Sequence, residues 1–287
     1  MNQLTLRSAP SVSPMLRALG VAALLAALAA CSQSTQAVSD GAPVAATSEA
    51  VKARTAHPRS LADAGAALAL EDASLTVDQR ARVEAVRAEL SAASASEKTA
   101  RVALADRLAA QITAGALDRA ALEPYMTAIE AARAANEPAE QKALGDLHAA
   151  LTGGQRARLV AAARTKLEGH AFRDDGKERL EQVADELELS DTQRRAIKAR
   201  VVAQLGAHFA DHEREHGEFK ARAEAIAQAF ASESFDAATL DVGKDASAFM
   251  RPMGEAMLTL VEATLPELSA AQRAKLAEHV RARASSG

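Results

Sequence analysis

The chain has 287 residues, of which 48% are hydrophobic, 25% are charged and 2% are aromatic. Its formal net charge is −4, and without residues 1–30, which hold two basic and no acidic side chains, the charge becomes −6. An acidic chain is a poor partner for nucleic acid, and a composition dominated by Ala, Leu, Glu, Arg and Lys favours helices over a thick α/β core.

Residues 1–30 have the zones of a removable signal peptide. Arg7 and Arg17 precede an apolar run over 18–30, which is shorter than the roughly 20 residues that a membrane-spanning helix needs. The run ends in Leu28-Ala29-Ala30-Cys31, which resembles a bacterial lipobox. We therefore expect cleavage before Cys31 and attachment of lipid to its thiol; an ordinary secretory signal that happens to precede a Cys is the alternative.

The segment 31–60 is expected to be a flexible tether between the lipid and the folded part. It is rich in Ser, Thr, Ala, Gln and Pro and has no sustained period. Cys31 is the only cysteine, so the mature chain has no internal disulfide. The membrane is then contacted only through the lipid, on the periplasmic side. Ser32 after Cys31 favours the outer over the inner membrane.

An internal duplication organises the rest of the chain. Four similar pentads occur in two pairs, and each is followed by Arg and, eight positions after its Leu, by an aliphatic residue. The pentads are Leu75–Gln79, Leu151–Gln155, Leu189–Gln193 and Leu268–Gln272. The pentads within a pair are 76 and 79 residues apart, and residues 105–118 parallel 223–236 without gaps. This self-similarity predicts two copies of one unit, at about 61–168 and 176–287.

Each pentad has the pattern of a helix-capping box. The hydroxyls of Thr76, Thr152, Ser190 and Ser269 precede Gln79, Gln155, Gln193 and Gln272 by three residues. In a capping box the hydroxyl accepts from the third helical N–H while the Gln reaches back to the cap N–H. The pattern predicts four helix starts.

Helical periodicity follows the first pentad of each unit. Apolar residues from Val83 to Leu108 recur at spacings of three and four, interrupted only at Glu97, and predict one helix over about 77–113. The second unit repeats this and predicts a helix over about 191–232. Each unit is therefore expected to be a long antiparallel helical hairpin with short flanking helices and no strands, in an all-α fold.

Caps and prolines are expected to divide the returning helices. Asp118 and Asp236 follow the long helices and are the expected caps of what comes next. Prolines are expected to break or restart helices at positions 124, 138, 252 and 266.

The paired pentads resemble the LTxxQ motif of the Spy/CpxP family of periplasmic proteins, in which one motif opens the long helix and another the last helix. The resemblance covers about 61–287, with Ser replacing Thr in both pentads of the second unit. It implies curved helical hairpins, often paired as dimers, that act as ATP-independent chaperones, stress regulators or metal-binding sensors. The expected partners are unfolded or misfolded envelope proteins, bound on an apolar concave face. Here the two units could instead pair within one chain.

No catalytic constellation is recognisable, so we expect no enzyme and no required cofactor. His208, His212 and His216 share one helix face, where they interrupt the apolar stripe. Neutral imidazole suits zinc, nickel, copper and cobalt, and Met253 and Met257 on the returning helix are candidate additional ligands of a divalent transition metal. The alternatives are a polar stretch of the concave face or a pH sensor for the histidines, and core packing or a client-binding surface for the methionines.

Overall fold

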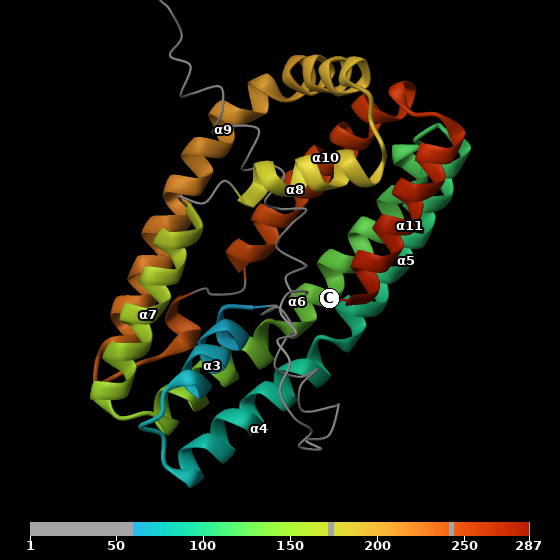
Figure 1. The fold of residues 1–287 in the computed structure, drawn as a ribbon. Coiled ribbons are helices and arrows are strands. Elements are labelled where there is room, and N and C mark those ends of the chain that lie inside the picture. The colour runs from blue at the N-terminus through green and yellow to red at the C-terminus, as the bar shows by residue number, and fades with distance from the viewer. Residues whose placement is uncertain (1–59, 172–174, 241–243, 287) are drawn as a thin grey trace, which may run out of the picture.

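The computed structural model describes the backbone of residues 60–171, 175–240 and 244–286, with side chains for all of these except 166–171, 175–180, 205–220, 244–250 and 286. This part of the chain is all-α and holds no strand, as predicted (Figure 1). The elements are α3 (Leu61–Glu71), α4 (Val77–Ala93), α5 (Ala95–Ala114), α6 (Arg119–Ala150), α7 (Gly153–Ala171), α8 (Asp175–Glu186), α9 (Asp191–Ala231), η1 (Ala237–Leu240), α10 (Lys244–Thr264), η2 (Leu265–Glu267) and α11 (Ala270–Ser286). Within the described ranges no helix is both long and apolar enough to cross a membrane.

The four pentads open α4, α7, α9 and α11. Thr76 with Gln79 and Ser190 with Gln193 form complete capping boxes. The other two pentads have the same reciprocal bonds, since the backbone N–H of Thr152 and of Ser269 each donates to the Gln oxygen three residues on, at 2.9 Å. All four predicted helix starts are found, including that of α7, which begins in spite of two glycines.

The long helix of the first unit differs from its prediction. Instead of one helix over 77–113, α4 ends and α5 begins at Ser94, whose φ and ψ are −77° and 1°. The Ser94 hydroxyl donates to the carbonyl of Ser91 at 3.1 Å, a local bond that competes with regular helix geometry. In the second unit α9 is continuous over 41 residues, as predicted.

The two predicted aspartate caps are found, whereas most of the predicted helix breaks at proline are not. Asp118 accepts from the N–H of Ala121 and opens α6, while Asp236 accepts from Ala238 before η1. Three prolines expected to break helices instead lie inside them, at positions 124 and 138 of α6 and 252 of α10. All three are exposed, so water on that side can serve the backbone that each leaves unbonded. Only Pro266, in η2, separates two helices.

Apolar side chains form three clusters. The first joins α3, α4, the second half of α6 and α7 to the end of α9, with Val83 and Leu147 at its centre. The second joins α5, the first half of α6, the end of α10 and α11 around Leu108 and Ile112. A smaller cluster lies between α9 and α10. The apolar stripe of the first unit is thus covered by other helices.

The last helix of each unit packs against the long helix of the other unit. α11 lies along α5, and α7 lies along α9, as both pairs in Figure 1 show. The two units therefore contact each other extensively within one chain. Between the two units, α7 continues to Ala171 and α8 begins at Asp175. The unit boundaries themselves stay a prediction.

Candidate functional site

The two pentads of each unit lie side by side and are joined through their glutamines. In the first unit the side-chain amides of Gln79 and Gln155 pair reciprocally, with Nε2–Oε1 distances of 2.8 and 3.0 Å. Gln193 and Gln272 pair likewise in the second unit, at 2.9 and 3.3 Å. Each Gln therefore caps its own helix with its oxygen and ties two helix starts together with its nitrogen.

The same nitrogens also bind the backbone in an equivalent way. Each Nε2 donates to the carbonyl of the residue directly before the leucine of the partner pentad. The pairs are Gln79 to Ala150, Gln155 to Ser74, Gln193 to Glu267 and Gln272 to Glu188, at 2.9, 3.3, 2.6 and 3.4 Å. The repeated pentads of the two units thus make equivalent hydrogen bonds in the folded chain.

The arginines that follow the pentads complete this arrangement. Arg156, Arg194 and Arg273 each donate to the carbonyl of the leucine that opens their own pentad, at 2.9 to 3.0 Å. Arg80 donates instead to the carbonyl of Leu70 at the end of α3. Since the polar groups of the motif are used in holding helix ends together, the pentads form the framework of the molecule, and a binding site is better sought elsewhere.

A buried polar layer separates the first two apolar clusters. Glu97 of α5 is 4% exposed, and its Oε1 lies 2.8 Å from Arg101 and 3.7 Å from Arg133 of α6. Asn136 and Glu140 lie on the same face of α6 as Arg133. Burial raises the pKa of the Glu140 carboxyl, Arg133 opposes that rise, and Glu97 adds to it. This layer lies just after the break at Ser94, where the continuous apolar packing of the first unit stops.

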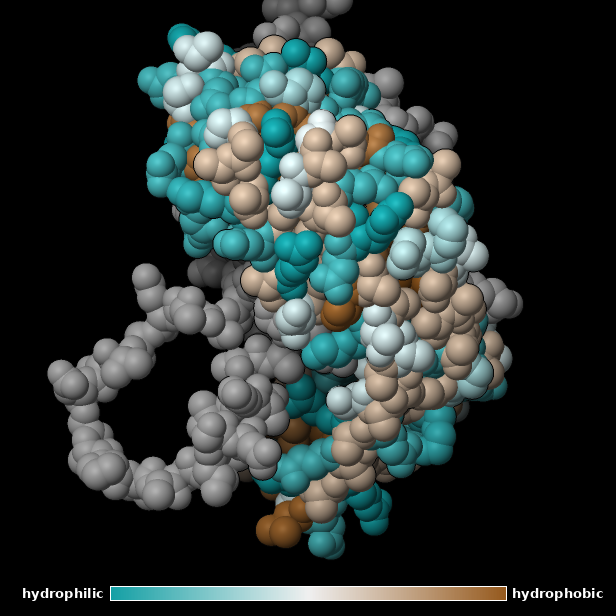
Figure 2. Space-filling model, turned by 90° about the vertical axis from the view of Figure 1, so that its right-hand side faces the viewer, coloured by the Kyte–Doolittle hydropathy of each residue, from teal (hydrophilic) through white to brown (hydrophobic). Residues whose placement is uncertain are grey.

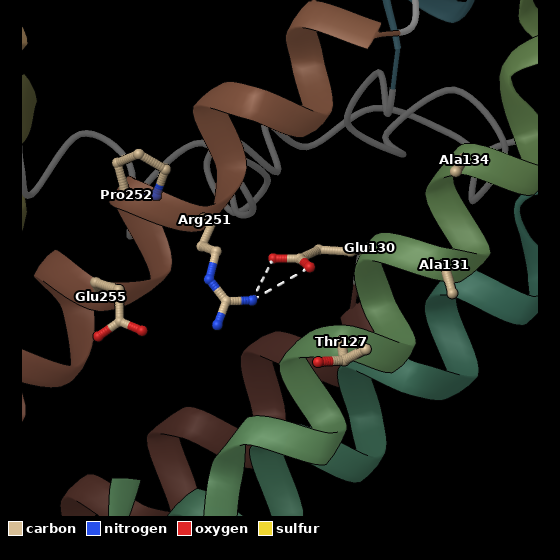
Figure 3. Close-up of a pocket in the computed structure, with 7 residues that line it drawn as sticks. All are labelled: Thr127, Glu130, Ala131, Ala134, Arg251, Pro252 and Glu255. Carbon is tan, nitrogen blue, oxygen red and sulfur yellow. Dashed lines mark hydrogen bonds and ion pairs between the residues drawn. The ribbon is translucent and has the colours of Figure 1, made fainter. Parts of the chain in front are cut away.

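An open groove of about 700 Å³ runs between α6 and α10 (Figure 3). Its lining consists of Thr127, Glu130, Ala131, Ala134, Arg251, Pro252 and Glu255. Ala131 and Ala134 are exposed and give the α6 wall a small apolar surface. Because α6 belongs to the first unit and α10 to the second, the groove exists only where the two units meet.

Two arginines join α6 to α10: Arg251 lines the groove, and Arg119 lies outside its lining but bonds to Glu255, which is part of it. Arg251 extends from α10 toward α6, as Figure 3 shows, and Arg119 extends from α6 toward α10. Each lies between two carboxylates: Arg251 between Glu123 and Glu130, and Arg119 between Glu255 and Glu262. Hydrogen bonds to Glu262 raise the pKa of Arg119, and those to Glu123 raise that of Arg251. Four carboxylates against two guanidinium groups leave two negative charges in excess.

No family model, no curated protein and no solved structure matches this chain. The resemblance to the Spy/CpxP family therefore stays a prediction drawn from the pentads, and the groove is described from its own residues alone.

The residues predicted to bind lipid or metal are only partly placed. Cys31 lies outside the described residues, as do the side chains of His208, His212 and His216, although α9 is helical through all three. Met257 of α10 packs against the second apolar cluster. In the described part of the chain, no three His, Cys, Asp or Glu side chains gather so as to hold a metal ion. The metal site stays a prediction.

The amino-acid sequence alone does not predict the groove residues. They come together only because α6 crosses α10, which periodicity within either helix does not reveal. One signal was present: Glu123, Glu130 and Glu137 recur every seven residues, which places three carboxylates on one face of a helix.

Proposed function

We propose that this chain is an ATP-independent chaperone of the bacterial envelope, and that the groove between α6 and α10 binds segments of partly unfolded proteins. The observation that carries the proposal is the groove itself. It is open and has small apolar side chains and charged walls. Such a surface favours loose capture of an extended chain over tight docking of a small molecule.

The surface elsewhere supports placing the client site in this groove. Val83, Val86 and Leu90 of the first stripe are buried, so they offer a client nothing. Among the described residues the exposed large hydrophobic side chains are Leu61, Val77 and Val202, at distant positions of the sequence. Figure 2 shows a face where hydrophilic and weakly hydrophobic residues are mixed. The proposed client site is therefore not a large apolar surface.

The other parts of the proposal come from the sequence. The signal peptide and Cys31 would place the chain in the periplasm on a lipid anchor, in the outer membrane by preference. The four pentads resemble the LTxxQ motif of the Spy/CpxP chaperones. No nucleotide and no catalysis are involved in the proposed activity.

Aggregation suppression tests the proposal. The protein, in stoichiometric amount and without nucleotide, should keep several unrelated denatured clients in solution. Ala131→Trp fills the groove and should raise several-fold the amount of protein needed. Ala128→Trp is the matched control, since Ala128 is also exposed on α6 but does not line the groove. If no client is protected, or if both variants behave like the wild type, the groove is not a client site.

A metal-binding sensor or buffer is the second candidate, favoured by the helical course of α9 through the three histidines. On a helix, His212 and His216 are four residues apart and can chelate one ion. Calorimetric titration of the metal-stripped protein with zinc, nickel, copper and cobalt should show micromolar or tighter binding that is lost in His212→Ala/His216→Ala. Equal binding in both proteins, or none in either, would leave these histidines without a metal role.

A further inference from the structure

The groove carries an acidic stripe that continues beyond its lining. Glu123 and Glu130 flank Arg251, and Glu137 lies on the same face of α6 one heptad further on. The neighbouring polar layer offers no compensating charge, since Glu97 and Glu140 there face Arg101 and Arg133 as two acids against two bases. From Glu123 to Glu137 the stripe is about 21 Å long.

Along the axis of α6, the chain enters the folded part near the level of one end of this stripe. α3 runs parallel to α6. The carbonyl of Ser74, just after α3, accepts a hydrogen bond from Gln155, which lies just after the end of α6. A Cβ on Gly65 would lie 3.1 Å from Leu147. Ser60, five residues earlier, is therefore near the level of residue 142, and the start of α3 faces the middle of the molecule in Figure 1. The groove begins roughly 12 Å further along α6.

The sequence directly before α3 is basic, and its extended length is close to that of the acidic stripe. Residues 51–59, Val-Lys-Ala-Arg-Thr-Ala-His-Pro-Arg, hold Lys52, Arg54 and Arg59 and no acid. Pro58 disfavours the helical conformation at His57. From Lys52 to Arg59 an extended chain spans about 23 Å, close to the length of the acidic stripe.

We propose that the segment 51–59 binds in the groove between α6 and α10 of its own chain. Arg59, Arg54 and Lys52 would then follow the acidic stripe in the direction from Glu137 to Glu123. The segment occupies the surface that an extended client would use. This inference rests on the groove and its charge, and not on chaperone activity.

Zero-length cross-linking of the full mature chain tests the proposal without any client. A carbodiimide joins an amine to a carboxylate only where the two are in contact, and mass spectrometry of the digest identifies the pair. We expect Lys52 to be joined to Glu123, Glu130 or Glu255. Lys142 is the internal standard, since its Nζ lies 2.9 Å from Glu89 and 2.6 Å from Asp146.

Charge reversal provides the matched control. Arg54→Glu/Arg59→Glu keeps the Lys52 amine but replaces two attractions with two repulsions, and the Lys52 cross-link should fall about fivefold or more. The Lys142 cross-link should not change. Raising the salt to 1 M should also weaken the Lys52 product, because charges are screened beyond about 3 Å at that concentration.

If the groove does not hold segment 51–59 of its own chain, the cross-linked products will differ. If Lys52 is joined to acids all over the surface, or to none while Lys142 reacts, the segment does not bind the groove. A mixture of isotopically light and heavy chains distinguishes the remaining case. Products that join a light to a heavy chain would assign the groove to a second copy and overturn the intrachain proposal.

Discussion

At the scale of single residues, the capping role of the pentads was predictable and the second role of their glutamines was not. A capping box is local, since Thr76 and Gln79 are three residues apart and one hydroxyl and one amide suffice. The amide nitrogen has no local partner. It meets the partner pentad 76 or 79 residues away, and only the folded chain shows which groups it binds.

Replacing Gln155 by Glu separates the two roles. A carboxylate still accepts from the N–H of Thr152, but it cannot donate to the carbonyl of Ser74 or to Gln79. Because Gln155 is 6% exposed, we expect Gln155→Glu to lower the free energy of unfolding by about 2 kcal/mol. Urea denaturation measures this. Gln204→Glu, on the exposed surface of α9, should change it by less than about 0.5 kcal/mol; equal effects would show that the amide nitrogen does not matter.

Gly115 offers a second test, with a control in the same chain. It ends α5 with φ at +81°, and a Cβ there would lie 3.1 Å from Cζ of Arg273 on α11. Gly115→Ala should cost about 1–2 kcal/mol in stability. Gly145→Ala should instead stabilise by about 0.5–1 kcal/mol, since Gly145 is helical and its Cβ meets nothing within 4 Å. A Gly115→Ala variant as stable as the wild type would contradict this account of the turn.

At the scale of elements, periodicity predicted the helices but not the break in the first one. Leu90, Ala93, Ala100 and Leu104 continue the apolar pattern across Ser94, so the pattern alone favours a single helix. The signal for a change was Glu97, whose carboxylate interrupts the stripe. Glu97 could be recognised as an exception from the sequence, but its partner Arg133 lies on another helix and could not.

The polar layer predicts an unusual pH dependence. Burial raises the pKa of Glu140 above its ordinary value of 4.5, so the folded state binds that proton more tightly than the unfolded state does. The stabilisation from the protonated group is present below 4.5 and is lost as pH rises through the raised pKa. Glu140→Gln should therefore be more stable than the wild type at pH 7, and the difference should shrink below pH 4.5.

Chemical denaturation between pH 4 and pH 7 checks this sign. Glu84→Gln, an exposed change on α4, controls for the general loss of one acidic side chain. A Glu140→Gln variant that is less stable than the wild type at pH 7 would mean that attraction to Arg133 outweighs burial.

At the scale of the whole molecule, the duplication was visible in the sequence, whereas the way the copies combine was not. The pentads show where helices start, and the stripes show which faces are apolar. Neither says whether α11 covers the long helix of its own unit or that of the other. The exchange of last helices follows from tertiary packing, with Leu108 and Ile112 of α5 in the same cluster as Ala277 of α11. The groove is a product of that same pairing.

The exchange predicts that the two units stay together without a covalent connection. We expect a protease site inserted between Ala171 and Asp175 to be cut in the folded protein, and the two fragments to elute together as a one-to-one complex. Each fragment would otherwise expose the faces of α5, α7, α9 and α11 that are now buried between units.

After cutting, unfolding of the complex also separates the two fragments, so the melting temperature should rise with protein concentration. The uncut insertion variant is the control and should melt independently of concentration. Fragments that separate at micromolar concentration and remain helical would show instead that each unit folds alone.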